Sequence, residues 1–94
     1  MFKSLQEDLI IIDHPLKMQM AKLLSMPEED IRFLPDHSKN FNRVLKNSKK
    51  AATLNLKSND REYDLQLFTY AGAPIILDSS SETSYLVIRT IDIV

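Results

Sequence analysis

The chain has 94 residues, of which 44% are hydrophobic and 27% are charged, and its formal net charge is −1. This composition is typical of one globular domain and excludes an intrinsically disordered chain. The absence of cysteine excludes a disulfide framework and a thiolate metal site, and is consistent with a reducing compartment.

The first half of the chain has apolar residues at helical spacing. Leu5, Leu9 and Ile12 predict a first helix over residues 3–11, although the β-branched run at its end suits a strand equally well. Asp13 then caps a second helix that continues through Met26. A strand over residues 16–20 is the rival interpretation, which we reject because its alternation does not continue.

Prolines divide the rest of this half into shorter segments. Ser25 and Glu28 have the spacing of a capping box, which predicts a third helix. This helix is short, because Pro35 excludes helical geometry at the preceding residue. Asp36 or Ser38 can cap the helix that follows.

The second half of the chain has the alternation of an antiparallel sheet. Residues 52–56 and 63–67 alternate apolar and polar side chains around a turn at residues 58–61, so they predict a hairpin with one polar face. A buried strand over residues 75–77 and a polar loop over 78–84 follow. The last strand, residues 85–93, is apolar on both faces, and we expect it inside the sheet.

These elements predict an α+β fold in one domain, residues 1–94. Residues 1–50 are expected to be mainly helical and residues 51–94 mainly strands. The N-terminal helices would pack on one face of a C-terminal antiparallel sheet of three or four strands. The longest apolar run, residues 9–12, is far shorter than a membrane span, and acidic residues follow the N-terminus, so we expect a cytoplasmic chain without a signal peptide.

A one-sided basic segment, residues 39–50, is the most informative feature of the sequence. Lys39, Arg43, Lys46 and Lys50 fall at i, i+4, i+7 and i+11, which would place them on one face of a helix. Apolar residues fall on the opposite side, and no acidic residue interrupts the segment. With Lys49, these cations are the candidate partner-binding residues. A solvated helix face, an acidic protein partner and a nucleic acid all explain them.

The two histidines occur in the same local pattern, Asp13-His14 and Asp36-His37. Neighbouring residues on a chain point apart, and both aspartates are well placed as helix caps, so we assign no catalytic residue. The spacing resembles no known metal site, and we assign no metal ligand. A single glycine excludes the phosphate-binding loops, so no cofactor is expected.

The sequence therefore favours a small non-enzymatic binding module that regulates or inhibits a macromolecular partner. Accessory proteins of phages and mobile elements are often of this size. The partner would be an acidic protein surface or, in the alternative, a nucleic acid bound by the basic helix 39–50. A homodimer formed through a sheet edge stays open.

Overall fold

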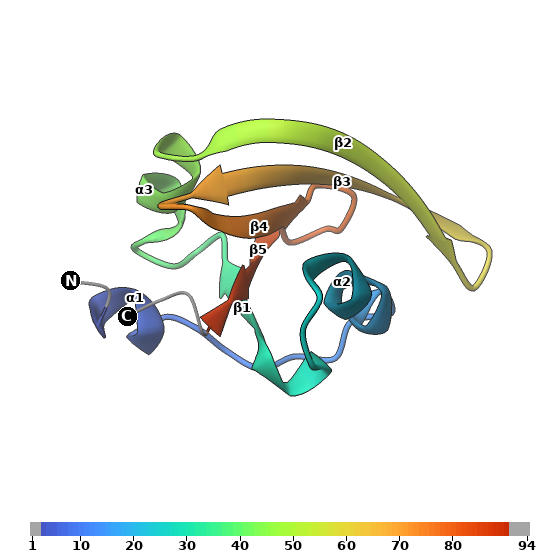
Figure 1. Ribbon diagram of the computed structural model, residues 1–94, viewed down its shortest axis with the longest axis horizontal. Helices are drawn as coiled ribbons and strands as arrows, with labels where there is room; N and C mark the ends of the chain where they lie inside the picture. The colour runs from blue at the N-terminus through green and yellow to red at the C-terminus, as the bar shows by residue number, and fades with distance from the viewer. Residues whose placement is uncertain (1–2, 91–94) are drawn as a thin grey trace.

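A computed structural model describes residues 3–90 and has a five-stranded antiparallel sheet in the order β1-β5-β4-β3-β2 (Figure 1). An α+β fold with an antiparallel sheet is as predicted, but the sheet has more strands than the predicted three or four. The strands are β1 (Ile31–Pro35), β2 (Lys49–Ser58), β3 (Arg61–Tyr70), β4 (Ala73–Asp78) and β5 (Tyr85–Arg89). The helices are α1 (Lys3–Glu7), α2 (Lys17–Leu24) and α3 (Phe41–Lys46), with one 3-10 turn, Glu28–Asp30.

The long hairpin of β2 and β3 has the predicted position and the predicted polar face. Asn59 and Asp60 have positive φ values of 54° and 64°, as the primed turn of a two-residue hairpin loop requires. On one face of the hairpin, Leu54 and Leu56 pack against the core. On the other face, Asn55 donates a hydrogen bond to the carboxylate of Asp64 (2.9 Å).

The last strand lies inside the sheet, as expected. β5 pairs with β4 on one side and with β1 on the other. Both of its faces are covered, which explains why its sequence does not alternate. The part of the predicted strand beyond residue 90 lies outside the described residues.

The additional strand, β1, comes from a segment in which the sequence predicted a helix. Only the 3-10 turn at Glu28–Asp30 is helical there, and Ile31 onward pairs with β5. The segment lies between Pro27 and Pro35, which leave too few residues for a stable helix. Pro35 is tolerated as the last residue of a strand near the sheet edge.

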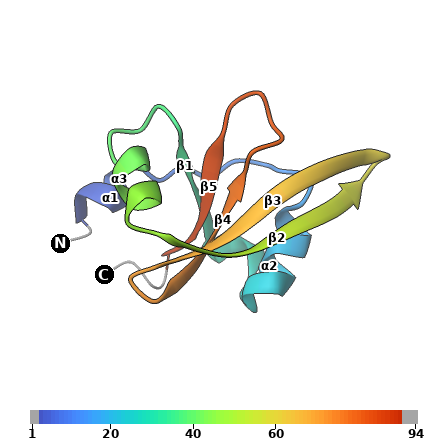
Figure 2. The same ribbon diagram turned by 90° about the horizontal axis from the view of Figure 1, so that it is seen from above.

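The helices cover both faces of the sheet, so the predicted packing on one face is wrong (Figure 2). One core cluster joins α2 to one face through side chains such as Met20, Leu65 and Val87. A second cluster joins α1 and α3 to the other face through Leu5, Val44 and others. The two clusters arise because adjacent residues of a strand point to opposite faces. The molecule therefore has three layers, with the sheet in the middle.

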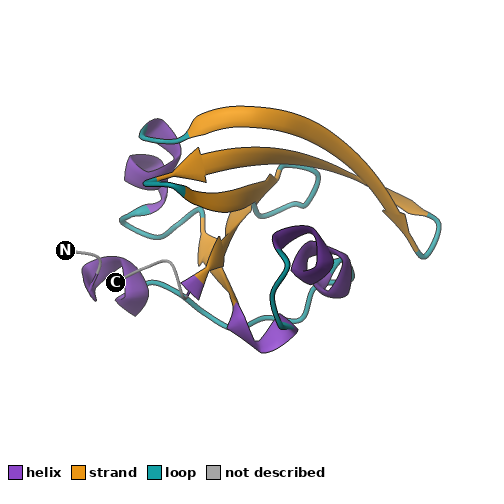
Figure 3. Cartoon of the chain, viewed as in Figure 1, coloured by secondary structure: helices purple, strands orange, loops and turns teal. Residues whose placement is uncertain are grey.

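The helices are shorter than predicted (Figure 3). α1 ends at Glu7, and the β-branched run after it enters the sheet edge, where Ile10 and Phe33 exchange two backbone hydrogen bonds of 3.0 Å. α2 begins at Lys17 without a side-chain cap, so the cap predicted at Asp13 is wrong. Ser25 ends α2 in a left-handed conformation, so it does not begin the next helix.

The helix predicted over residues 39–50 spans only Phe41–Lys46. Asn47 and Ser48 donate side-chain hydrogen bonds to the carbonyls of Arg43 and Val44, four residues earlier. Such bonds satisfy the last carbonyls of a helix and favour its end. None of the helices that the structure describes is long and apolar enough to cross a membrane.

Candidate functional site

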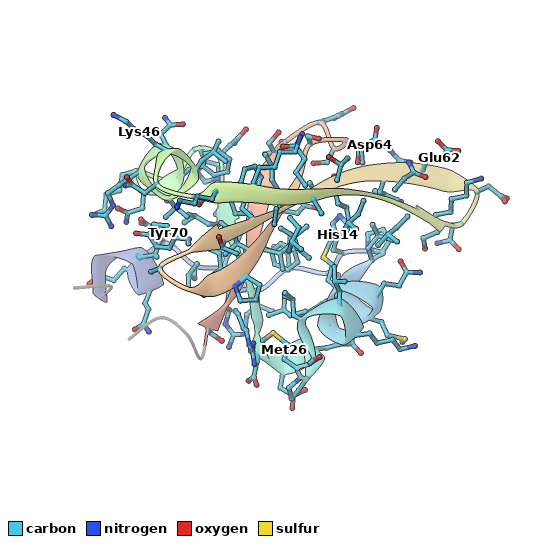
Figure 4. The ribbon with its side chains drawn as sticks, turned by 45° about the horizontal axis from the view of Figure 1, so that its top comes forward. His14, Met26, Lys46, Glu62, Asp64 and Tyr70 are labelled. Atoms are coloured by element: carbon cyan, nitrogen blue, oxygen red, sulfur yellow. The ribbon has the colours of Figure 1, made fainter. Side chains whose placement is uncertain are left out.

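A buried histidine–aspartate pair lies between α2 and the sheet. His14, in the turn before α2, donates from Nε2 to the Asp78 carboxylate at the end of β4 (2.8 Å). The side chains are 5% and 0% exposed. The Nδ1 atom of His14 accepts the backbone N–H of Leu16 (3.1 Å), so a neutral ring carries its proton on Nε2. Figure 4 shows His14 between the β2–β3 hairpin and α2.

The carboxylate of Asp78 is held from several sides. Its Oδ1 atom accepts the backbone N–H and the hydroxyl of Ser80 at 3.0 and 2.7 Å. The Tyr85 hydroxyl approaches Oδ2 at 3.4 Å. Burial alone raises the pKa of the Asp78 carboxyl, but the hydrogen bonds from His14 and Ser80 outweigh it and lower this pKa below its usual value.

Aromatic rings surround the imidazole of His14. The ring centroids of Phe33, Tyr63 and Tyr85 lie 6.1, 5.7 and 5.4 Å from it. Burial raises the pKa of the Tyr85 hydroxyl, and the adjacent Asp78 carboxylate raises it further. The tyrosine therefore stays protonated and is a hydrogen-bond donor toward this carboxylate.

An open cavity of about 440 Å³ lies over this network. The guanidinium of Arg61 sits 5.5 Å from the ring centroid of Tyr63 at one side. The cavity is lined by Ile12, Asp13, His14, Pro15, Arg61, Tyr63, Ser81, Glu82 and Tyr85. Its lining carries charges of both signs, from Asp13, Glu82 and Arg61.

The geometry of the pair favours a structural role. Both nitrogens of His14 are occupied by hydrogen bonds within the protein, so no lone pair faces the cavity as a general base requires. The pair joins the start of α2 to the end of β4, two segments separated by 64 positions in the sequence. We therefore interpret the hydrogen bond between His14 and Asp78 as a buried polar contact that links the layer of α2 to the sheet.

The structure does not bring the two Asp–His motifs together. Asp13 is exposed at the cavity, and His37 is exposed in the turn after β1. His14 instead contacts Asp78, which the sequence interpretation missed. One signal in the sequence could have indicated it: Asp78 is an acidic residue directly after the apolar run 75–77, which was predicted to be a buried strand. Among residues 3–90, no three histidine or acidic side chains form a cluster that could hold a metal ion.

The candidate partner-binding residues lie at the end of the β2–β3 hairpin that is away from its turn. Arg43 and Lys46 are exposed on α3, while Lys49 and Lys50 are exposed at the start of β2. Lys39 is exposed in the turn before α3. Figure 4 shows Lys46 at one end of the molecule and Glu62 and Asp64 toward the other.

The predicted spacing on one helix face is therefore wrong for most of this set, although the cations remain together at one end of the sheet. Only Arg43 and Lys46 share a helix face. The ion pairs found within residues 3–90 join His14 to Asp78 and Lys57 to Glu62, so they involve none of the five cations.

Comparisons of the chain with protein-family models, with curated proteins and with solved structures found no match.

Proposed function

We propose that this protein is a non-enzymatic binding module that docks on an acidic surface of a macromolecular partner and regulates or inhibits it. The proposal depends mainly on one observation. Lys39, Arg43, Lys46, Lys49 and Lys50 are all exposed on α3 and its flanks, outside every ion pair found in residues 3–90. We call this set the basic surface.

The electrostatics of such a surface favour association with an acidic partner. An exposed face that serves only solubility normally mixes charges of both signs, whereas the basic surface has one sign. Complementary charges steer the encounter of two proteins and set which partners are accepted. The occupied nitrogens of His14 support the non-enzymatic part of the proposal, because the histidine nearest the cavity is not available as a base.

A nucleic acid is the second candidate partner. The exposed side chain of Asn42 lies in the same segment as Arg43 and Lys46. Amide side chains contact bases and phosphates, and cations neutralise the backbone. Binding of this kind weakens steeply as the salt concentration rises.

The test compares two variants that change the net charge equally. Arg43→Glu with Lys46→Glu reverses two charges of the basic surface, and Lys17→Glu with Lys22→Glu reverses two lysines of α2. Each immobilised protein captures its partners from nuclease-treated host extract. We expect a protein that the wild type and the control retain and that the first variant loses. Equal capture by both variants would refute the proposal, and a gel shift with random-sequence duplex DNA tests the second candidate.

A further inference from the structure

The two edges of the sheet differ. β1 has five residues, and Ile10 covers its outer edge through two backbone hydrogen bonds to Phe33. β2 has ten residues and is the terminal strand on the other side. No backbone hydrogen bond from any residue in 3–90 reaches its outer edge. An edge of this length is a template for another strand.

The backbone groups that face outward on β2 follow from the register of the hairpin. The Asp64 carbonyl accepts the N–H of Ser79 (3.3 Å), so the backbone of Asp64 points away from β2. Asn55 lies directly opposite Asp64. In an antiparallel ladder such a pair directs its backbone groups away from each other, and the pattern repeats every second residue. Thr53, Asn55 and Lys57 therefore present their N–H and C=O groups to the open edge.

The charges of β2 select the kind of strand that the edge accepts. Its charged residues are Lys49, Lys50 and Lys57, and it has no acidic residue. Lys49 and Lys50 also belong to the basic surface. We propose that the open edge of β2 takes up an extended acidic segment of a partner protein as an additional antiparallel or parallel strand. This inference depends on the proposed function and names the form in which the partner binds.

A second copy of this chain fits the edge less well. Antiparallel pairing of two β2 strands along their length would bring Lys57 of one copy beside Lys49 and Lys50 of the other. Like charges at opposite or diagonal positions destabilise a strand pair. Lysines on an edge and the bulge near Ala51 are also common devices against indiscriminate pairing. An acidic segment turns Lys49 and Lys50 into favourable contacts, whereas Lys57 is already paired with Glu62.

The side-chain faces of β2 define the segment further. Leu54 and Leu56 are half-buried on the face toward α2, so an added strand with apolar residues on that face would extend this core. On the other face of the sheet, the acidic residues of the added strand would lie about 5 Å from β2 and about 10 Å from β3. The carboxylates of Glu62 and Asp64 on β3 are thus about one Debye length away at ~0.1 M salt, which weakens their repulsion. The expected segment alternates acidic and apolar residues.

The test uses a peptide of alternating glutamate and valine, about ten residues long to match β2. Amide hydrogen exchange is measured by NMR on the full chain with and without this peptide. We expect the amides of Thr53, Asn55 and Lys57 to exchange at least about tenfold more slowly when the peptide is bound. A peptide of alternating lysine and valine should give no protection. Absence of binding by the glutamate peptide, or binding without protection of these three amides, would overturn the inference.

A matched pair of variants tests the backbone directly. Thr53→Pro removes an outward N–H without removing a bond to β3, and Thr53→Ala keeps that N–H. We expect the proline variant to bind the peptide at least about tenfold more weakly and the alanine variant to bind it almost as the wild type does. Equal affinities of the two variants would contradict strand addition. If the proline variant does not fold, the amide exchange of the wild-type protein decides the question.

The outcomes also separate this inference from the proposed function. Loss of binding in the Arg43→Glu, Lys46→Glu variant together with full binding by Thr53→Pro would leave the basic surface as the site and remove the edge. Sedimentation tests whether a second copy of this chain occupies the open edge of β2. A dimer whose Thr53, Asn55 and Lys57 amides are protected without peptide would mean that a second copy fills the edge, and would overturn the inference.

Discussion

At the scale of single residues, Asp78 has the environment with the largest consequence for stability. Its carboxylate is 0% exposed and accepts hydrogen bonds from His14 and Ser80. Removing one partner of a buried polar pair leaves the other without its bond, which costs more than the pair itself contributes. The stability of the chain therefore depends on this contact between layers.

We expect Asp78→Ala to lower the free energy of unfolding by about 3 kcal/mol, because Nε2 of His14 would lose its acceptor. Urea denaturation followed by circular dichroism measures the change. Asp36→Ala is the control, since Asp36 is exposed and should change stability by less than about 0.5 kcal/mol. Equal losses in the two variants would contradict a structural role of the buried pair.

The pH dependence of stability tests the same carboxyl. An aspartate in the unfolded chain has a pKa of about 3.9, and the hydrogen bonds in the fold lower the pKa of Asp78. The unfolded chain therefore binds more protons between the two pKa values, and the free energy of unfolding rises with pH there. The contribution of Asp78 is present above about pH 4 and is lost as the pH falls through the lowered pKa. We expect Asp78→Asn to flatten this part of the stability curve relative to the wild type, and parallel acid slopes would contradict the assignment.

At the scale of elements, the turn between β3 and β4 has a positive φ at one residue that does not favour it. Ala71 and Gly72 connect β3 to β4 with φ values of 51° and 84°. An alanine side chain is strained in this region, and a glycine is not.

We expect Ala71→Gly to raise the free energy of unfolding by about 1 kcal/mol, because relief of left-handed strain exceeds the added entropy of the unfolded chain. Ala52→Gly, in the extended strand β2, is the matched control and should lower stability by about 0.5–1 kcal/mol. Thermal melts of both variants provide the comparison. A lower melting temperature for Ala71→Gly would mean that the turn does not adopt this conformation.

The elements that the sequence predicted correctly are those whose signals are local. The hairpin of β2 and β3, the short strand β4 and the interior position of β5 follow from alternation, turn residues and two-sided apolarity. β1 did not follow, because its partner residues in β5 are 50 or more positions away and four of its five residues are buried without simple alternation. The contact between His14 and Asp78 is hidden for the same reason, since nothing near either residue indicates the other. The helix predicted from the spacing of the cations over residues 39–50 was too long, because the side chains of Asn47 and Ser48 bond to carbonyls of the last turn of α3.

At the scale of the whole molecule, the sheet separates two core clusters, whereas a sheet covered by helices on one face would have a single cluster. Neighbouring residues of β4 belong to different clusters: Ile75 packs with α1 and α3, and Ile76 packs on the side of α2. The two residues are 1% and 0% exposed. The two residues are of the same type and adjacent in one interior strand. Substituting each in turn therefore compares how much the two layers contribute to stability.

We expect Ile75→Ala and Ile76→Ala each to lower the free energy of unfolding by about 2–5 kcal/mol, since each leaves a cavity in a fully packed cluster. For a chain of this size, whose total stability is about 5–10 kcal/mol, both losses should appear as a shift of one cooperative transition. Differential scanning calorimetry and chemical denaturation measure both the size of the shift and the number of transitions. Ile10→Ala, at a position 43% exposed, is the control and should shift the transition little.

A neutral Ile75→Ala would mean that α1 and α3 do not form a packed layer. Two separate transitions would mean that the layers fold independently, whereas a single shared transition is what a sheet buried on both faces requires, because neither cluster can form unless the strands between them are in place.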